Sequence, residues 1–401
     1  MRRQVDVQAA QSTGAEAAAK SGDLRKPSVV FVLSSLEVGG SERKTVRLAN
    51  VLHGRGRQVT IAYLSEPKTL SSAVVPEIAV VPLRRVGKFS LGALRRLRNL
   101  IDQEQANVVV AVNLYPALYV ALLTRLPRFK HVCFASSLNT TDLVGRKAPR
   151  AIRLYKLVLP AMDVLLFGAE HQRKLWSEEY LNGRSVLSGV LYNGIDPAEY
   201  RRDLVRPWRP EDWPLERNII GYVGKLRREK ALDHLLQAAA ELVKRGFDAG
   251  VVLVGEGDQA EALQQLVDEL NIRDRVCFVG LASDVRPYLA GFNVFALTST
   301  SVETFSNAAL EALAMQCPLV SSSIGGMPEM LKFGGGKTYA AGDVQSLTEA
   351  LESVLANPGN RAAMGELGRR TVVQRFSIDA MVNSFDALIA SASDGQMHMQ
   401  P

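Results

Sequence analysis

Short apolar runs alternate with amphipathic stretches along almost the whole chain. In the first half the apolar runs are Ser28–Ser34, Val59–Leu64, Ala79–Pro82, Val108–Val112, Val132–Ala135 and Val164–Phe167. In the second half they are Ile219–Val223, Gly250–Val254, Val276–Val279, Asn293–Leu297 and Leu319–Ser322. Strand-like runs separated by helical stretches are typical of parallel sheets covered by helices. The pattern therefore predicts an α/β fold built from two Rossmann-like halves.

Between the two halves the alternation breaks down. Tyr192–Pro197 is rich in turn-forming residues, and Arg201–Arg217 is polar and irregular, with several prolines and tryptophans. We predict an N-terminal domain over 27–195 and a C-terminal domain over 196–377, with disordered tails at 1–26 and 392–401. Two such domains leave a central cleft between the carboxyl ends of their sheets, where α/β folds bind their ligands.

Composition agrees with a globular protein of two domains. The chain has 401 residues, of which 47% are hydrophobic and 22% charged. No stretch reaches the ~18 consecutive apolar residues that a membrane-spanning helix needs, and the N-terminus lacks the apolar core of a secretory signal. Cys133, Cys277 and Cys317 show no metal-ligand spacing, which favours a reduced, cytoplasmic location.

The net charge of +7 includes a basic cluster between residues 84 and 98. Its members are Arg84, Arg85, Lys88, Arg95, Arg96 and Arg98. Such a cluster can serve nucleic acid, an anionic membrane surface or anionic substrates. No nucleic-acid module is visible, so no nucleic-acid partner is expected. A solvated helix face is the favoured interpretation, and peripheral association with the inner face of a membrane stays open.

Two glutamates, Glu303 and Glu311, stand eight positions apart at a predicted junction of loop and helix. The strand Asn293–Leu297 leads into an exit loop, and Ser306 or Asn307 is the predicted N-cap of a helix that runs to about residue 316. Glu303 then lies at the carboxyl end of the strand, and Glu311 about one turn into the helix.

This junction suits a nucleoside diphosphate sugar. The free N–H groups and the positive dipole end of a helix N-terminus favour pyrophosphate. Carboxylates accept hydrogen bonds from ribose and hexose hydroxyls. The spacing of Glu303 and Glu311 alone would not exclude two ordinary solvated residues.

Further candidates follow other strands. Gly221–Lys230 carries a strand, a glycine and then the cations Lys225 and Lys230, which can neutralise a departing pyrophosphate. Gly255–Ala260 formally satisfies a dinucleotide-binding fingerprint, but the next strand does not end in the acidic residue that would bind the ribose. No D-x-D motif and no His/Cys cluster with metal spacing appears in the sequence, so we expect catalysis without a metal or other cofactor.

The segments around these candidates resemble the retaining glycosyltransferases of family 4. Glu303 and Glu311 match the E-x7-E motif of that family, and Leu310–Ala314, Pro318–Val320 and Gly325–Glu329 match the elements that follow it. Two departures are Cys317, where the family usually has glycine, and Asn113-Leu114-Tyr115, where many relatives have a histidine.

The resemblance covers about residues 27–390 and implies the GT-B fold, in which the last helix, here about 378–391, crosses back onto the N-terminal domain. It implies that Lys225 and Lys230 stabilise the leaving phosphate, that Glu303 binds the donor sugar and that Glu311 binds the ribose. The other implied donor-binding residues are Gly39, Gly40, Gly255, Gly280, Leu281, Phe305, Ser306, Asn307 and Ala308. Asn113 and Tyr115 are candidates on the acceptor side.

These observations lead us to expect a retaining hexosyltransferase that uses a nucleoside diphosphate sugar, UDP-sugar in preference to GDP-sugar. The expected acceptor is a hydroxyl of a glycan or lipid-linked molecule, in polysaccharide or glycolipid assembly. Two alternatives stay open. One is a GT-B nucleotide-sugar epimerase, and the other is a sugar-nucleotide binding protein without catalytic activity.

Overall fold

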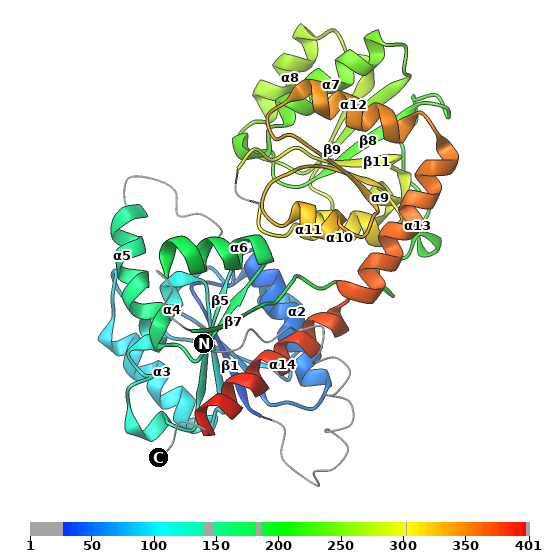
Figure 1. The fold of residues 1–401 in the computed structure, drawn as a ribbon. Coiled ribbons are helices and arrows are strands. Elements are labelled where there is room, and N and C mark those ends of the chain that lie inside the picture. Colours follow the sequence, from blue (N-terminus) through cyan, green and yellow to red (C-terminus); the bar gives the residue numbers. More distant parts are fainter. Residues whose placement is uncertain (1–26, 140–147, 182–185, 302, 398–401) are drawn as a thin grey trace.

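The protein forms two lobes, each with a parallel sheet at its centre (Figure 1). The computed structural model describes residues 27–139, 148–181, 186–301 and 303–397. The tail predicted at 1–26 lies outside these residues. Among the helices of the described part, none combines the length and apolar character that crossing a bilayer requires.

The N-terminal lobe contains a seven-stranded sheet with the order β3-β2-β1-β4-β5-β6-β7. Its strands are β1 Val29–Leu33, β2 Val59–Tyr63, β3 Ala79–Pro82, β4 Val108–Val112, β5 Cys133–Leu138, β6 Val164–Phe167 and β7 Leu187–Val190. The six strands predicted for this half are confirmed, and β7 was missed because its Ser-Gly centre lacks a β-rich pattern. The strand order reverses between β1 and β4, so the ligand-binding switch point of this domain lies at their carboxyl ends.

Helices cover both faces of the N-terminal sheet. They are α2 Gly40–Gly54, α3 Leu91–Gln103, α4 Leu114–Ala121, α5 Ala148–Val158, α6 Glu170–Leu175 and the last helix of the chain, α14 Ile378–Met397. Helix α14 packs on α2 and on the sheet, with the ring of Phe385 6.3 Å from that of Phe31. The predicted crossing of the last helix back onto the N-terminal domain is thus confirmed (Figure 1).

The C-terminal lobe contains a six-stranded sheet with the order β10-β9-β8-β11-β12-β13. Its strands are β8 Asn218–Val223, β9 Ala249–Val254, β10 Val276–Gly280, β11 Val294–Leu297, β12 Leu319–Ser322 and β13 Gly336–Tyr339. Its helices are α7 Leu232–Lys244, α8 Ala260–Glu269, α9 Arg286–Gly291, α10 Asn307–Ala314, α11 Met327–Leu331, α12 Val344–Leu355 and α13 Pro358–Arg375. Edge strand β13 was missed because Gly-Lys-Thr-Tyr is half exposed and has no apolar run.

Short turns of other helical types connect these elements. The 3-10 turns are Thr69–Ala73, Pro127–Phe129, Leu159–Ala161, Arg202–Leu204, Arg228–Lys230 and Arg273–Arg275, and Trp176–Tyr180 forms a π turn after α6.

Three boundaries differ from the sequence-based expectation. Helix α14 extends to Met397, so residues 392–397, predicted as part of a disordered tail, are helical; Ala392 is buried against the N-terminal core and continues the packed face. Helix α10 ends at Ala314, before the positive φ of 58° at Gln316. The predicted linker also packs on the C-terminal core through Trp208 and Trp213. The exact domain limits stay predictions.

Candidate active site

Helix α10 begins where the sequence predicts. The side chain of Ser306 is the N-cap and accepts a hydrogen bond from the backbone N–H of Ala309 at 3.3 Å. The N–H groups of the first turn are left without acceptors in the helix, and its positive dipole end lies there. Asn307 Oδ1 is buried without a hydrogen-bond partner among the described residues. The N–H groups and the dipole of the helix start therefore suit an anionic ligand, whereas the Asn307 oxygen suits a hydrogen-bond donor.

Lys230 and Glu303 lie together beside this helix start. Lys230 Nζ is 2.6 Å from Glu303 Oε2, and Ser299 Oγ donates a hydrogen bond to the same oxygen at 3.1 Å. Lys230 follows β8 and Glu303 follows the neighbouring strand β11, so parallel pairing of the strands brings them to one sheet edge. Lys225, on the loop between β8 and Lys230, has an exposed side chain. A cation and a carboxylate are thus adjacent at the carboxyl end of the sheet.

Glu311 is buried and contacts the other lobe. Its side chain is 6% exposed, and Oε1 is 3.3 Å from Arg47 Nη2 of helix α2. The Tyr200 hydroxyl also donates a hydrogen bond to it. Burial raises the pKa of Glu311, while Arg47, the nearby Arg43 and the Tyr200 hydrogen bond act in the opposite direction. The second glutamate of the motif therefore lies at the junction of the two domains.

Glycines bring three strand ends of the C-terminal sheet into close contact. The N–H of Gly255, after β9, donates to the carbonyl of Gly280 in β10 at 2.8 Å. Gly255 has a φ of 136°, and a Cβ there would lie 2.0 Å from the Gly224 carbonyl oxygen. A side chain at Gly255 is thus sterically excluded. Leu281 follows directly and is 77% exposed.

The facing edge of the N-terminal sheet carries the remaining candidates. A Cβ on Gly40 would lie 3.8 Å from Asn307 Nδ2, so the loop after β1 approaches the start of α10. Asn113, after β4, donates through Nδ2 to Ser41 Oγ at 3.1 Å. Tyr115 is two residues further on and accepts a hydrogen bond from Arg85 at 3.0 Å. Gly40 of the N-terminal domain and Asn307 and Glu311 of the C-terminal domain therefore lie at the junction of the two lobes.

Phe305 differs from the expectation. Its side chain is 4% exposed, with ring centroids 4.7 Å from Tyr192 and 5.1 Å from Phe376. Its carbonyl accepts a hydrogen bond from Asn193 Nδ2 at 2.6 Å. The side chain is buried at the domain junction, so only the backbone of Phe305 could contact a sugar-nucleotide donor.

Glu329 joins the two domains beside this aromatic group. Its carboxylate accepts hydrogen bonds from the N–H groups of Glu170 and His171 at 2.8 and 2.6 Å, and from the Tyr192 hydroxyl at 2.9 Å. Glu170 and His171 form the first turn of α6, where a carboxylate is favoured. Helix α11 of the C-terminal domain thereby holds the first turn of α6 and the start of the connecting segment.

Comparison with known families decides where the chain belongs. Residues 38–199 match the model described as Glycosyltransferase Family 4, and residues 209–371 match the model described as Glycosyl transferases group 1. The chain is a family 4 glycosyltransferase. Its two parallel-sheet domains form the GT-B fold.

Several known proteins resemble this glycosyltransferase. N-acetyl-alpha-D-glucosaminyl L-malate synthase of Bacillus anthracis is 25% identical over 361 residues, 88% of this chain and 93% of that protein. D-inositol 3-phosphate glycosyltransferase of Mycolicibacterium paratuberculosis is 34% identical over 227 residues, 50% of this chain and 49% of that protein. The Anabaena HepE structure in complex with UDP has a TM-score of 0.76 and 18% identity, covering 91% of this chain and all of that one.

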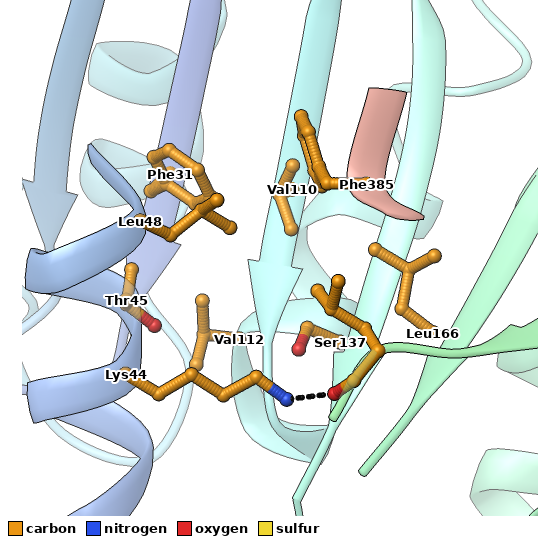
Figure 2. Close-up of a pocket in the computed structure, with 10 residues that line it drawn as sticks. Phe31, Lys44, Thr45, Leu48, Val110, Val112, Ser137, Leu166 and Phe385 are labelled. Atoms are coloured by element: carbon orange, nitrogen blue, oxygen red, sulfur yellow. Dashed lines mark hydrogen bonds between the residues drawn. The ribbon is translucent and has the colours of Figure 1, made fainter. Parts of the chain in front are cut away.

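One buried cation in the glycosyltransferase was not anticipated. Lys44 of α2 enters a small apolar pocket between α2, the sheet and α14, and its Nζ donates to the Leu191 carbonyl (Figure 2). Asn139 Oδ1 is a second acceptor at 3.4 Å. Burial lowers the pKa of Lys44 to about 7.

Sequence reasoning also missed Arg47, Tyr200 and Glu329. A signal for Arg47 was present, because Arg43 and Arg47 are four residues apart on the helix after Gly40 and so share one face. Nothing in the sequence indicates that Tyr200 or Lys44 would contact another segment. Among the described residues, no three His, Cys, Asp or Glu side chains form a group that could hold a metal ion.

Proposed function

We propose that this glycosyltransferase moves a hexose-type sugar from UDP-sugar to an acceptor hydroxyl with retention of the anomeric configuration and without a metal ion. The observation that carries the proposal is the adjacency of Lys230 and Glu303 at the start of α10. In a nucleoside diphosphate sugar the β-phosphate is bonded to the anomeric carbon. A cation and a hydroxyl-binding carboxylate that lie side by side fit the two halves of that linkage.

The proposed reaction is a substitution on one face of the sugar. The bond between the anomeric carbon and the β-phosphate oxygen breaks, and the acceptor oxygen bonds to the same face of the carbon. The acceptor proton passes to an oxygen of the departing phosphate. Lys225, Lys230 and the N-terminus of α10 stabilise the negative charge that grows on this phosphate.

The two glutamates take different parts in this proposal. Glu303 binds hydroxyls of the transferred sugar, and Glu311 binds the ribose. The choice of UDP is supported by solved structures of the same fold that are named in complex with UDP and with UDP-glucose. A cytoplasmic location, at the inner face of the membrane where the acceptor is a lipid, belongs to the proposal. So does a role in polysaccharide or glycolipid assembly.

Release of nucleoside diphosphate tests the function. The protein is incubated with UDP-glucose, UDP-N-acetylglucosamine or GDP-mannose, and release is measured with and without a panel of acceptors. Acceptor-dependent release of UDP supports the proposal. Conversion of the donor sugar to its epimer in the absence of acceptor would indicate an epimerase. Binding without turnover under any condition would indicate a non-catalytic binding protein, and acceptor-dependent release from GDP-mannose alone would overturn the choice of UDP.

A further inference from the structure

Arg85 occupies the switch point of the N-terminal sheet. It follows β3, and its Nη2 lies 3.4 Å from Ser65 Oγ after β2, while Nη1 donates to the Tyr115 hydroxyl after β4 at 3.0 Å. The guanidinium carbon is 5.0 Å from the centroid of the Tyr115 ring. Since β1 lies between β2 and β4, this side chain spans the exit of β1, where the strand order reverses. Ligands of open α/β sheets bind at this point.

The partners that hold Arg85 are neutral. Besides the contacts with Ser65 and Tyr115, its Nη1 donates to the Gly87 carbonyl at 2.9 Å, and its Nε is buried without a hydrogen-bond partner in the described structure. No carboxylate of the described residues forms an ion pair with it. The guanidinium is thus oriented by its surroundings but its charge is not neutralised.

The charges of neighbouring cations are not neutralised either. Arg84, Lys88 and Arg95 are exposed, and none of them forms an ion pair with a described carboxylate. Like charges that are close in sequence to one oriented arginine add to a positive potential that attracts anions. The cluster that the sequence suggested as a solvated helix face therefore includes one cation that the fold holds in place at a ligand-binding edge.

A short chain of contacts connects this edge with the donor side. Tyr115 is two residues from Asn113, whose Nδ2 group donates to Ser41 Oγ at 3.1 Å. Ser41 follows Gly40, and a Cβ on Gly40 would lie 3.8 Å from Asn307 at the start of α10. Arg85 therefore lies in the N-terminal domain, on the acceptor side of the candidate active site.

We propose that Arg85, oriented by Tyr115 and Ser65, binds an anionic group of the acceptor, a phosphate or a carboxylate, with Arg84 and Lys88 adding charge. The inference rests on the proposed transfer to an acceptor hydroxyl. The planar guanidinium fork binds two oxygens of such a group at once and fixes its orientation. Binding there positions the acceptor hydroxyl at a defined distance from the donor.

Two sources of the anion share this chemistry. One is a small soluble acceptor, and the other is a lipid headgroup. Val86, Phe89 and Leu91 are 78%, 47% and 74% exposed and stand between the cations along the chain. Apolar side chains interleaved with cations suit a lipid surface as well as solvent, so the experiment includes an arm for each source.

The test measures anion binding to the full chain in the presence of saturating UDP, which occupies the donor phosphate positions. One arm titrates inorganic phosphate by calorimetry. The other measures co-flotation with vesicles of phosphatidylcholine alone or of phosphatidylcholine mixed with phosphatidylglycerol. The variants are Arg85→Gln, Arg85→Lys and, as matched control, Arg125→Gln, an exposed arginine that follows α4 in the same domain. Circular dichroism checks that each variant is folded.

We expect Arg85→Gln to weaken anion binding about tenfold or more, as for loss of a charge-assisted hydrogen-bonded pair. Arg85→Lys should retain part of the affinity because it keeps the charge but not the fork, and Arg125→Gln should bind like wild type. An effect in the phosphate arm indicates a soluble acceptor. An effect confined to vesicles that contain phosphatidylglycerol indicates a headgroup. The proposal is overturned when Arg85→Gln matches wild type in both arms, or when wild type binds neither probe.

The readout is independent of the proposed function. It needs no sugar transfer and compares variants that leave Lys230, Glu303 and Glu311 intact. Absence of UDP binding or of turnover would count against the proposed function. An anion affinity that is insensitive to residue 85, together with normal UDP release, would count against the acceptor subsite alone.

Discussion

Replacing Arg47 with Gln should tighten the binding of UDP. In the structure Arg47 Nη2 is 3.3 Å from Glu311 Oε1, and this carboxylate is the one proposed to bind the ribose. A bound ribose must share this oxygen with Arg47 or displace it. Without the Arg47 cation, no ion pair has to be broken when the ribose binds. The buried Glu311 carboxylate is then also left with fewer hydrogen-bond donors, so a hydrogen bond from a ribose hydroxyl stabilises it more.

The magnitude follows from the geometry of the pair. At 3.3 Å and an effective dielectric constant of about 20, the Coulomb attraction is about 5 kcal/mol. The Glu311 side chain is 6% exposed and the Arg47 side chain 26%, so desolvation offsets most of this attraction. A net contribution of about 1–2 kcal/mol remains, which corresponds to roughly 5- to 30-fold tighter binding of UDP.

The assay is calorimetric titration of UDP into wild type, Arg47→Gln, Glu311→Ala and the double variant. Glu311→Ala should weaken binding of UDP and raise the donor KM, and Arg47→Gln should have no effect in that background. Arg57→Gln is the control, because Arg57 pairs with Asp386 at 2.7 Å within the N-terminal lobe. Unchanged or weaker binding of UDP to folded Arg47→Gln would refute the reasoning, since Arg47 would then not compete with the ribose.

Three further outcomes are expected. Lys230→Ala should lower kcat by about 10²-fold, because phosphate charge grows in the transition state, whereas Arg228→Ala on the same turn should not; equal kcat values in the two variants would contradict the role of Lys230. Burial lowers the pKa of Lys44 from 10.5 to about 7. Between pH 7 and pH 10.5 the Lys44 amine is therefore neutral in the folded state and protonated in the unfolded state. Its contribution to stability should therefore rise across that pH window, by on the order of 3–5 kcal/mol, and urea unfolding at several pH values should show that Lys44→Met abolishes the rise. Turnover should survive EDTA, and loss of activity restored by Mg²⁺ or Mn²⁺ would contradict the metal-independent mechanism.

The local pattern of the sequence was sufficient to predict the start of α10 and every strand except β7 and β13. Buried parallel strands read as apolar runs, and Ser306 carries its own capping group, so neither depends on distant residues. Parallel order then places the residues after successive strands at one edge. For this reason the proximity of Lys230 and Glu303 could be anticipated without coordinates, and the structure places them 2.6 Å apart.

Contacts between segments far apart in the chain were decided by the tertiary structure alone. Arg47 and Glu311 belong to different domains, and their pairing depends on how the lobes meet. The orientation of Arg85 needs Ser65 from the loop after β2 and Tyr115 from helix α4. Helix α14 continues past residue 391, and its Ala392 is buried against the N-terminal core. The sequence near such residues does not predict their contacts, because they are stabilised by burial and by charge interactions with residues that only the assembled fold brings close.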